Sequence, residues 1–171
     1  NLMAGFAEEV FRLDEQGLGH LLAASGIGAL SAAFLLSVRG NTAGLTRVYV
    51  FGAALTSMAI LSFVSNSHVP IALLTLIFVG GFSVATSLSA YTLIQNMVID
   101  QYRARVISIN LAISVGGPAF GTLAIGWLAE FTGFQFALGA FAFVVLIAVV
   151  ILGPMILNSA AQIESRTKEA E

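Results

Sequence analysis

Two long uncharged runs, separated by a short charged segment, constrain this chain more than any other feature of its sequence. Residues 48–99 and 106–129 contain no Asp, Glu, Lys or Arg, and the charges between them are Asp100, Arg103 and Arg105. A helix needs about 20 apolar residues to cross the ~30 Å hydrocarbon core of a bilayer. An arginine at mid-bilayer costs on the order of 3 kcal/mol on the insertion scale. We therefore predict a membrane hairpin whose charged turn lies in water at one membrane face.

The composition agrees with this prediction. Hydrophobic residues make up 58% of the chain and charged residues only 9%, against about 25% charged in soluble domains. The absence of cysteine excludes disulfides, thiolate nucleophiles and Cys-ligated metals. The net charge of −2 is too small to favour nucleic acid as a partner. We expect a lipid bilayer around the chain and neither a metal nor a cofactor within it.

The fold class predicted from hydropathy is an all-α polytopic membrane protein with five complete spans. Residues 1–13 are too short to span alone and are interpreted as the end of a preceding helix. Because the chain begins with Asn1 rather than Met, we expect further sequence upstream. The predicted transmembrane unit, residues 1–157, precedes a polar tail at residues 158–171, and its spans are residues 18–38, 48–65, 71–99, 106–129 and 134–157.

The first span contains small residues that favour close helix packing. Ala24, Gly28 and Ala32 recur every four residues, which places them on one face of a helix. In lipid, such small residues let two helix backbones approach each other. We expect a tight contact between this face and another span.

Basic residues indicate the orientation, because short cytoplasmic loops retain Lys and Arg. Six of the seven fall on one side of the predicted spans, namely Arg39, Arg47, Arg103, Arg105, Arg166 and Lys168, whereas Arg12 is opposite. The opposite side carries the acidic residues Glu8, Glu9, Asp14, Glu15 and Glu130. We predict that the tail and the turn with Arg103 are cytoplasmic.

Charged residues of the cytoplasmic loops have two possible roles. Arg103 and Arg105 can bond carbonyls at helix C-termini or pair with Asp100, which would lock one conformation of a cytoplasmic gate. Alternatively, they and the loop residues Arg39 and Arg47 only set the topology, since surface ion pairs contribute less than about 1 kcal/mol. Both interpretations remain open from the sequence.

A polar stripe follows the third predicted span. Ser83, Ser87, Tyr91 and Gln95 recur every four residues along it. Polar groups avoid lipid, so the stripe should face protein or a water-filled cavity. These four residues are our candidates for a substrate cavity, although hydroxyls in membrane helices also bond simply to the preceding turn. Gln95, one turn before Asp100, also fits the cytoplasmic gate.

The fourth predicted span contains the motif Gly117-Pro118-Ala-Phe-Gly121. Glycines four residues apart give a flat face for a neighbouring helix. The proline removes a backbone hydrogen bond and permits bending. Gly117, Pro118 and Gly121 are therefore predicted to serve helix packing or a hinge.

Three segments of the chain carry a resemblance to a known family. They are Gly17-Leu-Gly19-His-Leu-Leu-Ala-Ala-Ser-Gly26-Ile-Gly28, the stretch from Thr92-Leu-Ile-Gln95 through Asp100-Gln-Tyr-Arg103-Ala-Arg105 to Ser108, and Pro118-Ala-Phe-Gly121 with Gly126-Trp-Leu-Ala-Glu130-Phe-Thr-Gly133. The chain resembles the C-terminal half of a major facilitator superfamily transporter, close to the enterobactin-exporter-like efflux branch. Ala104 departs from the branch's usual glycine, and residues 39–47 lack the acidic residue of the superfamily's signature loop.

The resemblance implies a function and a larger fold. The five spans would be helices eight to twelve of a twelve-helix fold, with residues 1–13 ending helix seven. The protein would export small organic molecules, such as drugs or siderophore-like compounds, by alternating access between this half and a missing N-terminal six-helix half. A bacterial inner membrane location follows from the same resemblance.

Two other classes of protein compete with this interpretation. Ala23-Ala24-Ser25-Gly26 approaches the Gly-x-Ser-Gly signature of intramembrane serine proteases. The nucleophile would need a base within hydrogen-bond reach, but His20 lies at the mouth of the same span and His68 in a turn. A permease subunit that works with a separate ATPase fits the hydropathy equally well, but not the pattern from Asp100 to Arg105.

Overall fold

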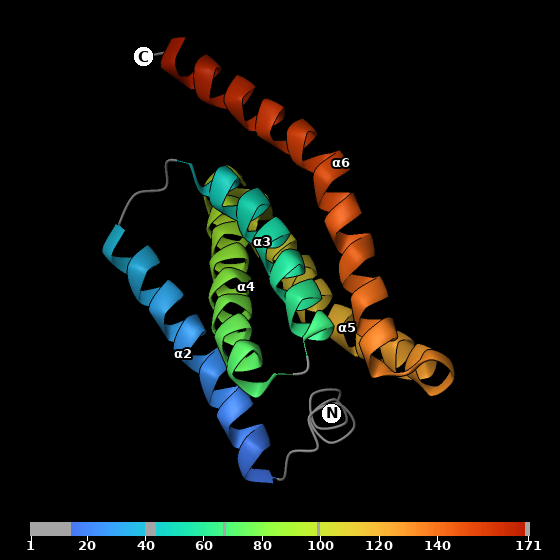
Figure 1. Ribbon diagram of the computed structural model, residues 1–171. Coiled ribbons are helices and arrows are strands. Elements are labelled where there is room, and N and C mark those ends of the chain that lie inside the picture. The colour runs from blue at the N-terminus through green and yellow to red at the C-terminus, as the bar shows by residue number, and fades with distance from the viewer. Residues whose placement is uncertain (1–14, 40–43, 67, 99, 170–171) are drawn as a thin grey trace.

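The computed structural model describes residues 15–39, 44–66, 68–98 and 100–169, and within these ranges the chain forms five α-helices and no strand (Figure 1). Each of the five contains a segment long and apolar enough to cross a membrane. The predicted all-α class and the count of five spans are therefore confirmed for the described residues. The helices are α2 (Glu15–Arg39), α3 (Leu45–Ser65), α4 (Val69–Met97), α5 (Asp100–Thr132) and α6 (Phe134–Glu169).

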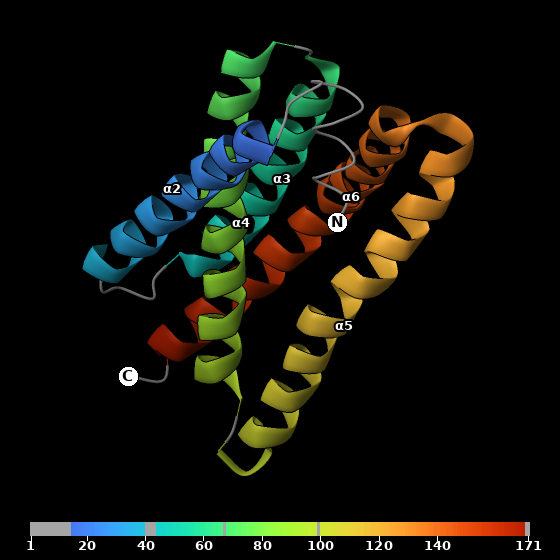
Figure 2. The same cartoon turned by 90° about the horizontal axis from the view of Figure 1, so that it is seen from below.

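Helix α4 is the centre of the packing. Helices α2 and α3 both pack extensively against it, and α6 packs against α3. Helix α5 contacts α6 and touches α4 only slightly. Figure 2 shows α5 and α6 diverging from their shared connection, so that most of α5 stands away from the other helices. Successive helices alternate in direction, which brings Arg39, Arg47 and Arg105 to one end of the bundle and Glu130 to the other.

The contact between α2 and α4 is a close approach of two backbones. A Cβ added to Gly28 would meet the backbone carbonyl of Ile77, and one added to Gly80 would meet the carbonyl of Ser25. At Gly81 the nearest atom would be the carbonyl oxygen of Gly28, at 3.3 Å. Only glycine permits this approach at Gly28 and Gly80. The tight contact expected from Ala24, Gly28 and Ala32 is confirmed, and its partner is α4.

Two small apolar clusters lie near one end of the bundle. The first joins α2, α3 and α4 through Leu21, Ala24, Phe63, Ala72 and Leu76. The second joins α5 and α6 through Ile125, Ala129 and Ala137. Near the same end, the Gln135 side-chain amide donates a hydrogen bond to the Val64 carbonyl, 3.3 Å away. Both clusters use the ends of the helices that lie opposite the arginines.

The charged segment from Asp100 to Arg105 belongs to a helix, and our prediction of a turn there was wrong. It forms the first turns of α5, and α4 ends at Met97. The Val98 N–H still donates to the Ile94 carbonyl at 3.2 Å, while the Val98 backbone is already extended. Arginine, alanine and glutamine are good helix formers, and an acidic residue is favoured at a helix N-terminus. The charges predict that this segment lies outside lipid, but they do not prevent it from being helical.

Gly133 alone connects α5 to α6. Its φ of 83° lies in the left-handed region, which favours glycine. The Gly133 N–H donates to the Ala129 carbonyl at 2.8 Å, and the Ala137 N–H donates to the Gly133 carbonyl at 3.1 Å. One residue therefore ends the first helix and begins the next.

Helix α6 extends beyond the predicted span and through most of the predicted polar tail, as far as Glu169. It changes direction part way along its length (Figure 1). Pro154 lies inside the helix, and proline is the ordinary cause of a bend because it removes one backbone hydrogen bond.

Candidate functional site

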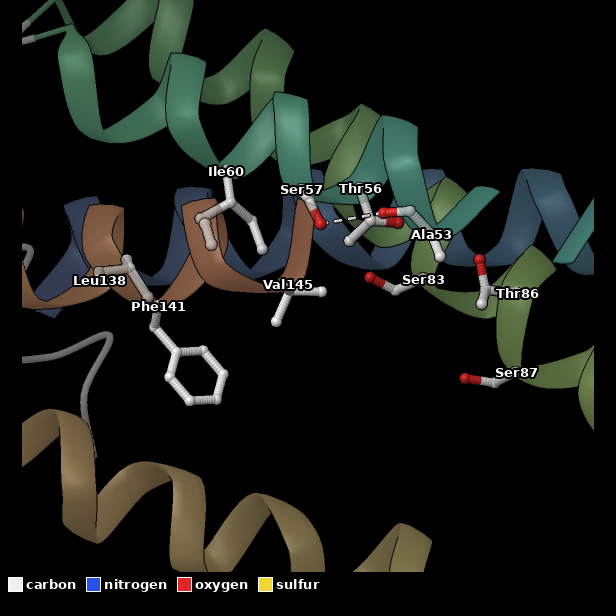
Figure 3. A pocket seen from close by; sticks show the side chains of 11 residues that line it. Ala53, Thr56, Ser57, Ile60, Ser83, Thr86, Ser87, Leu138, Phe141 and Val145 are labelled. Carbon is white, nitrogen blue, oxygen red and sulfur yellow. Dashed lines mark hydrogen bonds between the residues drawn. The ribbon is translucent and has the colours of Figure 1, made fainter. Parts of the chain in front are cut away.

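A pocket of about 300 Å³ lies between α3, α4 and α6 (Figure 3). Ser83 is the central residue of α4, and Thr56 and Ser57 follow the central residue of α3. The pocket is therefore about halfway along these two helices. Its lining comprises five hydroxyl residues, Thr56, Ser57, Ser83, Thr86 and Ser87, and six apolar ones, Ala53, Ile60, Leu138, Phe141, Ala142 and Val145.

Three of the hydroxyls donate to their own helix. Thr56 Oγ1 donates to the Gly52 carbonyl at 2.8 Å, Ser57 Oγ to the Ala53 carbonyl at 3.0 Å, and Thr86 Oγ1 to the Phe82 carbonyl at 2.7 Å. A hydroxyl has one hydrogen to donate and two lone pairs. These three groups therefore retain only acceptor capacity toward the pocket.

Ser83 and Ser87 are different. Neither hydroxyl is hydrogen-bonded to another residue in the described part of the chain. Figure 3 shows both side chains directed toward the open space of the pocket. Each can therefore donate as well as accept.

Phe141 on α6 forms the main apolar wall. The residue is 46% exposed, and its ring projects toward α5 (Figure 3). The same residue lines a smaller pocket of about 190 Å³ between α5 and α6. A Cβ on Gly121 of α5 would lie 3.9 Å from the Phe141 ring, an ordinary van der Waals distance. Phe141 thus connects the hydroxyl-lined pocket with the face of α5 that contains Gly121.

The predicted polar stripe reaches the pocket only in part. Ser83 and Ser87 line it, but Tyr91, 43% exposed, and Gln95, half-buried, are not among its lining residues. A step of four residues overshoots the 3.6-residue turn by about 40°. The stripe therefore rotates around α4 and leaves the pocket after Ser87. A role in substrate binding stays a prediction for all four residues.

Thr56, Ser57 and Thr86 were not predicted from the sequence. Hydroxyls within uncharged spans are a weak signal, because most of them bond to the preceding turn. What brings the three together is the contact of α3 with α4, where a Cβ on Gly52 would meet Thr86 Oγ1 at 2.5 Å. In the sequence, the one available signal of this close helix contact was Gly52, four residues before Thr56.

The predicted gate residues gather at one end of the helices. Arg39 is in the last turn of α2, Arg47 in the first turn of α3, and Arg105 is exposed near the start of α5. The side chains of Asp100 and Arg103 lie outside the described part of the structure. A gating role for these residues stays a prediction. A topological role requires only that the arginines lie at the same end of the helices, as they do.

The glycine-proline motif lies on a largely uncovered part of α5. The helix is continuous through Pro118. In the described part of the chain, no heavy atom outside the helix backbone lies within 4 Å of a Cβ placed on Gly117. Gly121, in contrast, faces the Phe141 ring of α6. The packing or hinge role of Gly117, Pro118 and Gly121 stays a prediction.

Within the described residues, no group of three or more His, Cys, Asp or Glu side chains comes together as a possible metal site. The pocket lining contains no charged residue either. The arrangement therefore supports binding of a small solute through hydroxyl groups and an aromatic ring.

Comparison with known families gives one match. The family model described as Major Facilitator Superfamily matches residues 1–171, the whole of the chain. No significant match is found among curated proteins or among solved structures.

Proposed function

Because this chain belongs to the major facilitator superfamily, we propose that it exports small organic molecules, drug or siderophore-like, as part of a secondary active transporter. The pocket between α3, α4 and α6 is its part of the substrate site. Members of this superfamily are transporters rather than enzymes, and the five apolar helices make the chain a multi-pass membrane protein. The enterobactin-exporter-like branch is the proposed place of the chain within the superfamily.

The observation that carries the proposal is the depth and chemistry of the pocket. Its hydroxyls lie near the middle of two spans. Polar groups at this depth avoid lipid and mark cavities or substrate paths. Secondary transporters bind substrate near the bilayer midplane and expose it alternately to the two sides.

We propose that a second six-helix bundle completes the site. None of the most apolar stretch of α5 is buried by the other helices. Alternating access requires one helical bundle to rock against another around the site. In this proposal α2 to α6 are helices eight to twelve, and the N-terminal six-helix half supplies the opposing wall.

The proposed orientation places the arginine end of the bundle in the cytoplasm. Arg39, Arg47 and Arg105 lie at that end and Glu130 at the other. Retention of basic residues on the cytoplasmic side supports this orientation. We propose a bacterial inner membrane location with a cytoplasmic C-terminus.

Two alternatives are less well supported. Ser25, the candidate protease nucleophile, lies in the contact between α2 and α4, where its Oγ would be 2.9 Å from a Cβ on Gly80. His20, on the same helix, is exposed. For a protease, Ser25→Ala would abolish activity, whereas a packing role predicts transport within about twofold of the parent. Co-purification of an ATPase would instead favour the permease-subunit alternative.

The proposal is tested by obstructing the pocket in the complete transporter. Ser87→Leu adds a bulky side chain at an exposed position of the lining. Ser31→Leu is the matched control, because Ser31 is exposed on α2 and its hydroxyl bonds to Ile27 of its own helix. We expect efflux of a panel of organic dyes to fall about tenfold for Ser87→Leu and less than about twofold for Ser31→Leu. Equal efflux by both variants, at equal membrane abundance, would contradict the proposal.

A further inference from the structure

We propose that the pocket between α3, α4 and α6 selects an uncharged solute that presents hydrogen-bond donors, hydroxyl or N–H groups, beside a flat apolar part. This inference rests on the proposed function, because it names the substrate class of the same site. It follows from the hydrogen-bonding state of each hydroxyl in the lining.

The first step concerns the three hydroxyls that already donate. Thr56, Ser57 and Thr86 give their hydrogens to backbone carbonyls at 2.7 to 3.0 Å. Ser57 is only 3% exposed, so a different partner would require its side chain to turn within a packed contact. Toward the pocket these residues offer lone pairs, and their complement on a solute is a donor.

The second step concerns Ser83 and Ser87. Among the described residues neither hydroxyl has a hydrogen-bond partner, and both point into the pocket (Figure 3). They lie one turn apart on α4. A solute hydroxyl accepts from one of them while it donates to another oxygen of the lining. A solute with acceptors only, such as an ether, uses just this pair.

The third step concerns charge. None of the eleven lining residues is ionisable at neutral pH. Burying an ion without a counter-charge is strongly unfavourable even in relaxed protein interiors. The pocket therefore disfavours both carboxylates and ammonium groups, although its lone pairs and the Phe141 ring would attract a cation at close range.

The fourth step concerns shape. The volume of about 300 Å³ is at the lower end of the range for small-molecule sites. Phe141 provides an aromatic face, and Ile60, Leu138 and Val145 complete an apolar wall beside the hydroxyls. An aromatic or other flat group fits against this wall while its polar group meets the oxygens of α3 and α4.

Three matched probes test the inference by binding to the complete transporter in lipid nanodiscs. The probes are 2-naphthylmethanol, its methyl ether and 2-naphthylmethylammonium, and their own fluorescence reports binding. The signal measured with the Ser87→Leu protein, whose pocket is obstructed, is subtracted to correct for probe that partitions into lipid. We expect the alcohol to bind about tenfold more tightly than either other probe, as one or two additional hydrogen bonds provide. In Thr56→Val/Thr86→Val, which removes two of the acceptor oxygens, this preference should fall to about twofold. In Ser83→Ala/Ser87→Ala, which removes the only partners of the ether, and in Ser31→Ala it should persist.

The outcomes separate the inference from the proposed function. Equal binding of the alcohol and its ether, tighter binding of the ammonium, or no binding of any probe would each overturn the inference. The proposed function would stand in all three cases if Ser87→Leu still blocked dye efflux. Loss of the alcohol preference in Ser31→Ala as well would show that the preference does not arise in this pocket, and would also overturn the inference.

Discussion

Gly28 and Gly80 determine how closely α2 and α4 approach each other. Each faces a backbone carbonyl of the other helix, which cannot move away as a flexible side chain can. Gly26, on the same helix as Gly28, has no atom of another element within 4 Å of an added Cβ. The two kinds of glycine allow a matched comparison.

We expect Gly80→Ala to destabilise the protein by about 1–3 kcal/mol or more, because an added methyl group overpacks the contact with Ser25. Gly26→Ala should leave stability unchanged or raise it slightly, since alanine is the better helix former. Thermal denaturation of the two purified variants, monitored by size-exclusion chromatography, measures the difference in stability. A Gly80→Ala protein as stable as Gly26→Ala would show that the backbones are not in contact.

At the residue scale the sequence predicted one side of this contact and not the other. Ala24, Gly28 and Ala32 are identified by their spacing, which is a property of one helix. Their partners Gly80 and Gly81 lie in a different span, and no pattern within either helix pairs the two. The same limit applies to the pocket, where Ser83 and Ser87 were expected but Thr56, Ser57 and Thr86 were not.

At the scale of helices, the connection between α5 and α6 depends on a single backbone conformation. Gly133 has a φ of 83°. The left-handed conformation destabilises a residue with a Cβ by about 1–2 kcal/mol. The effect is smallest for asparagine and largest for β-branched residues. We therefore expect Gly133→Val to lower the melting temperature by several degrees and Gly133→Asn to leave it nearly unchanged.

Thermal melts of the two Gly133 variants provide the measurement, with the parent protein as reference. A Val variant that melts with the Asn variant would mean that the connection is free to adopt another conformation. Apart from the two neighbouring residues of the chain, no heavy atom lies within 4 Å of a Cβ placed on Gly133, so the first atom of either side chain meets no obstruction.

The ends of the helices were harder to predict than their existence. The charges from Asp100 onward and the polar residues after Leu157 identified where lipid ends, but both α5 and α6 are helical in these regions. Backbone hydrogen bonds are satisfied within a helix in water as well as in lipid. Hydropathy therefore defines the membrane-embedded part of a helix and not its end.

At the scale of the whole molecule, alternating helix directions and the basic residues together predict the topology. The chain contains no cysteine, so single cysteines can be introduced one at a time. Tyr102→Cys and Ser159→Cys, both exposed, should react with a maleimide only when the cytoplasmic side is accessible. Ser65→Cys and Thr132→Cys, also exposed, should react from outside in intact cells.

Labelling of Tyr102→Cys from outside in intact cells would reverse the proposed orientation. Labelling of all four positions from one side would contradict the five crossings themselves. As a control, each variant is also labelled after denaturation. A cysteine that stays unreactive then has poor reactivity with the maleimide, and its lack of labelling in cells does not report topology.

The overall architecture was predictable because membrane crossing leaves few alternatives. Five uncharged segments joined by short connections must alternate in direction. The pocket was not predictable, since its position depends on the rotation of α3, α4 and α6 about their own axes. That rotation is determined by glycine contacts such as Gly52 with Thr86 and Gly153 with Val50, which the order of residues does not reveal.

The single-residue connection at Gly133 also bears on how the chain enters the membrane during synthesis. There is no polar loop between Thr132 and Phe134 to be carried across the bilayer. In the proposed orientation, the only charge near this connection that must be translocated is Glu130, at a cost on the order of 3 kcal/mol at the bilayer centre. The apolar residues of the two helices offset this cost together. With the proposed orientation, we therefore expect α5 and α6 to enter the membrane together as one hairpin.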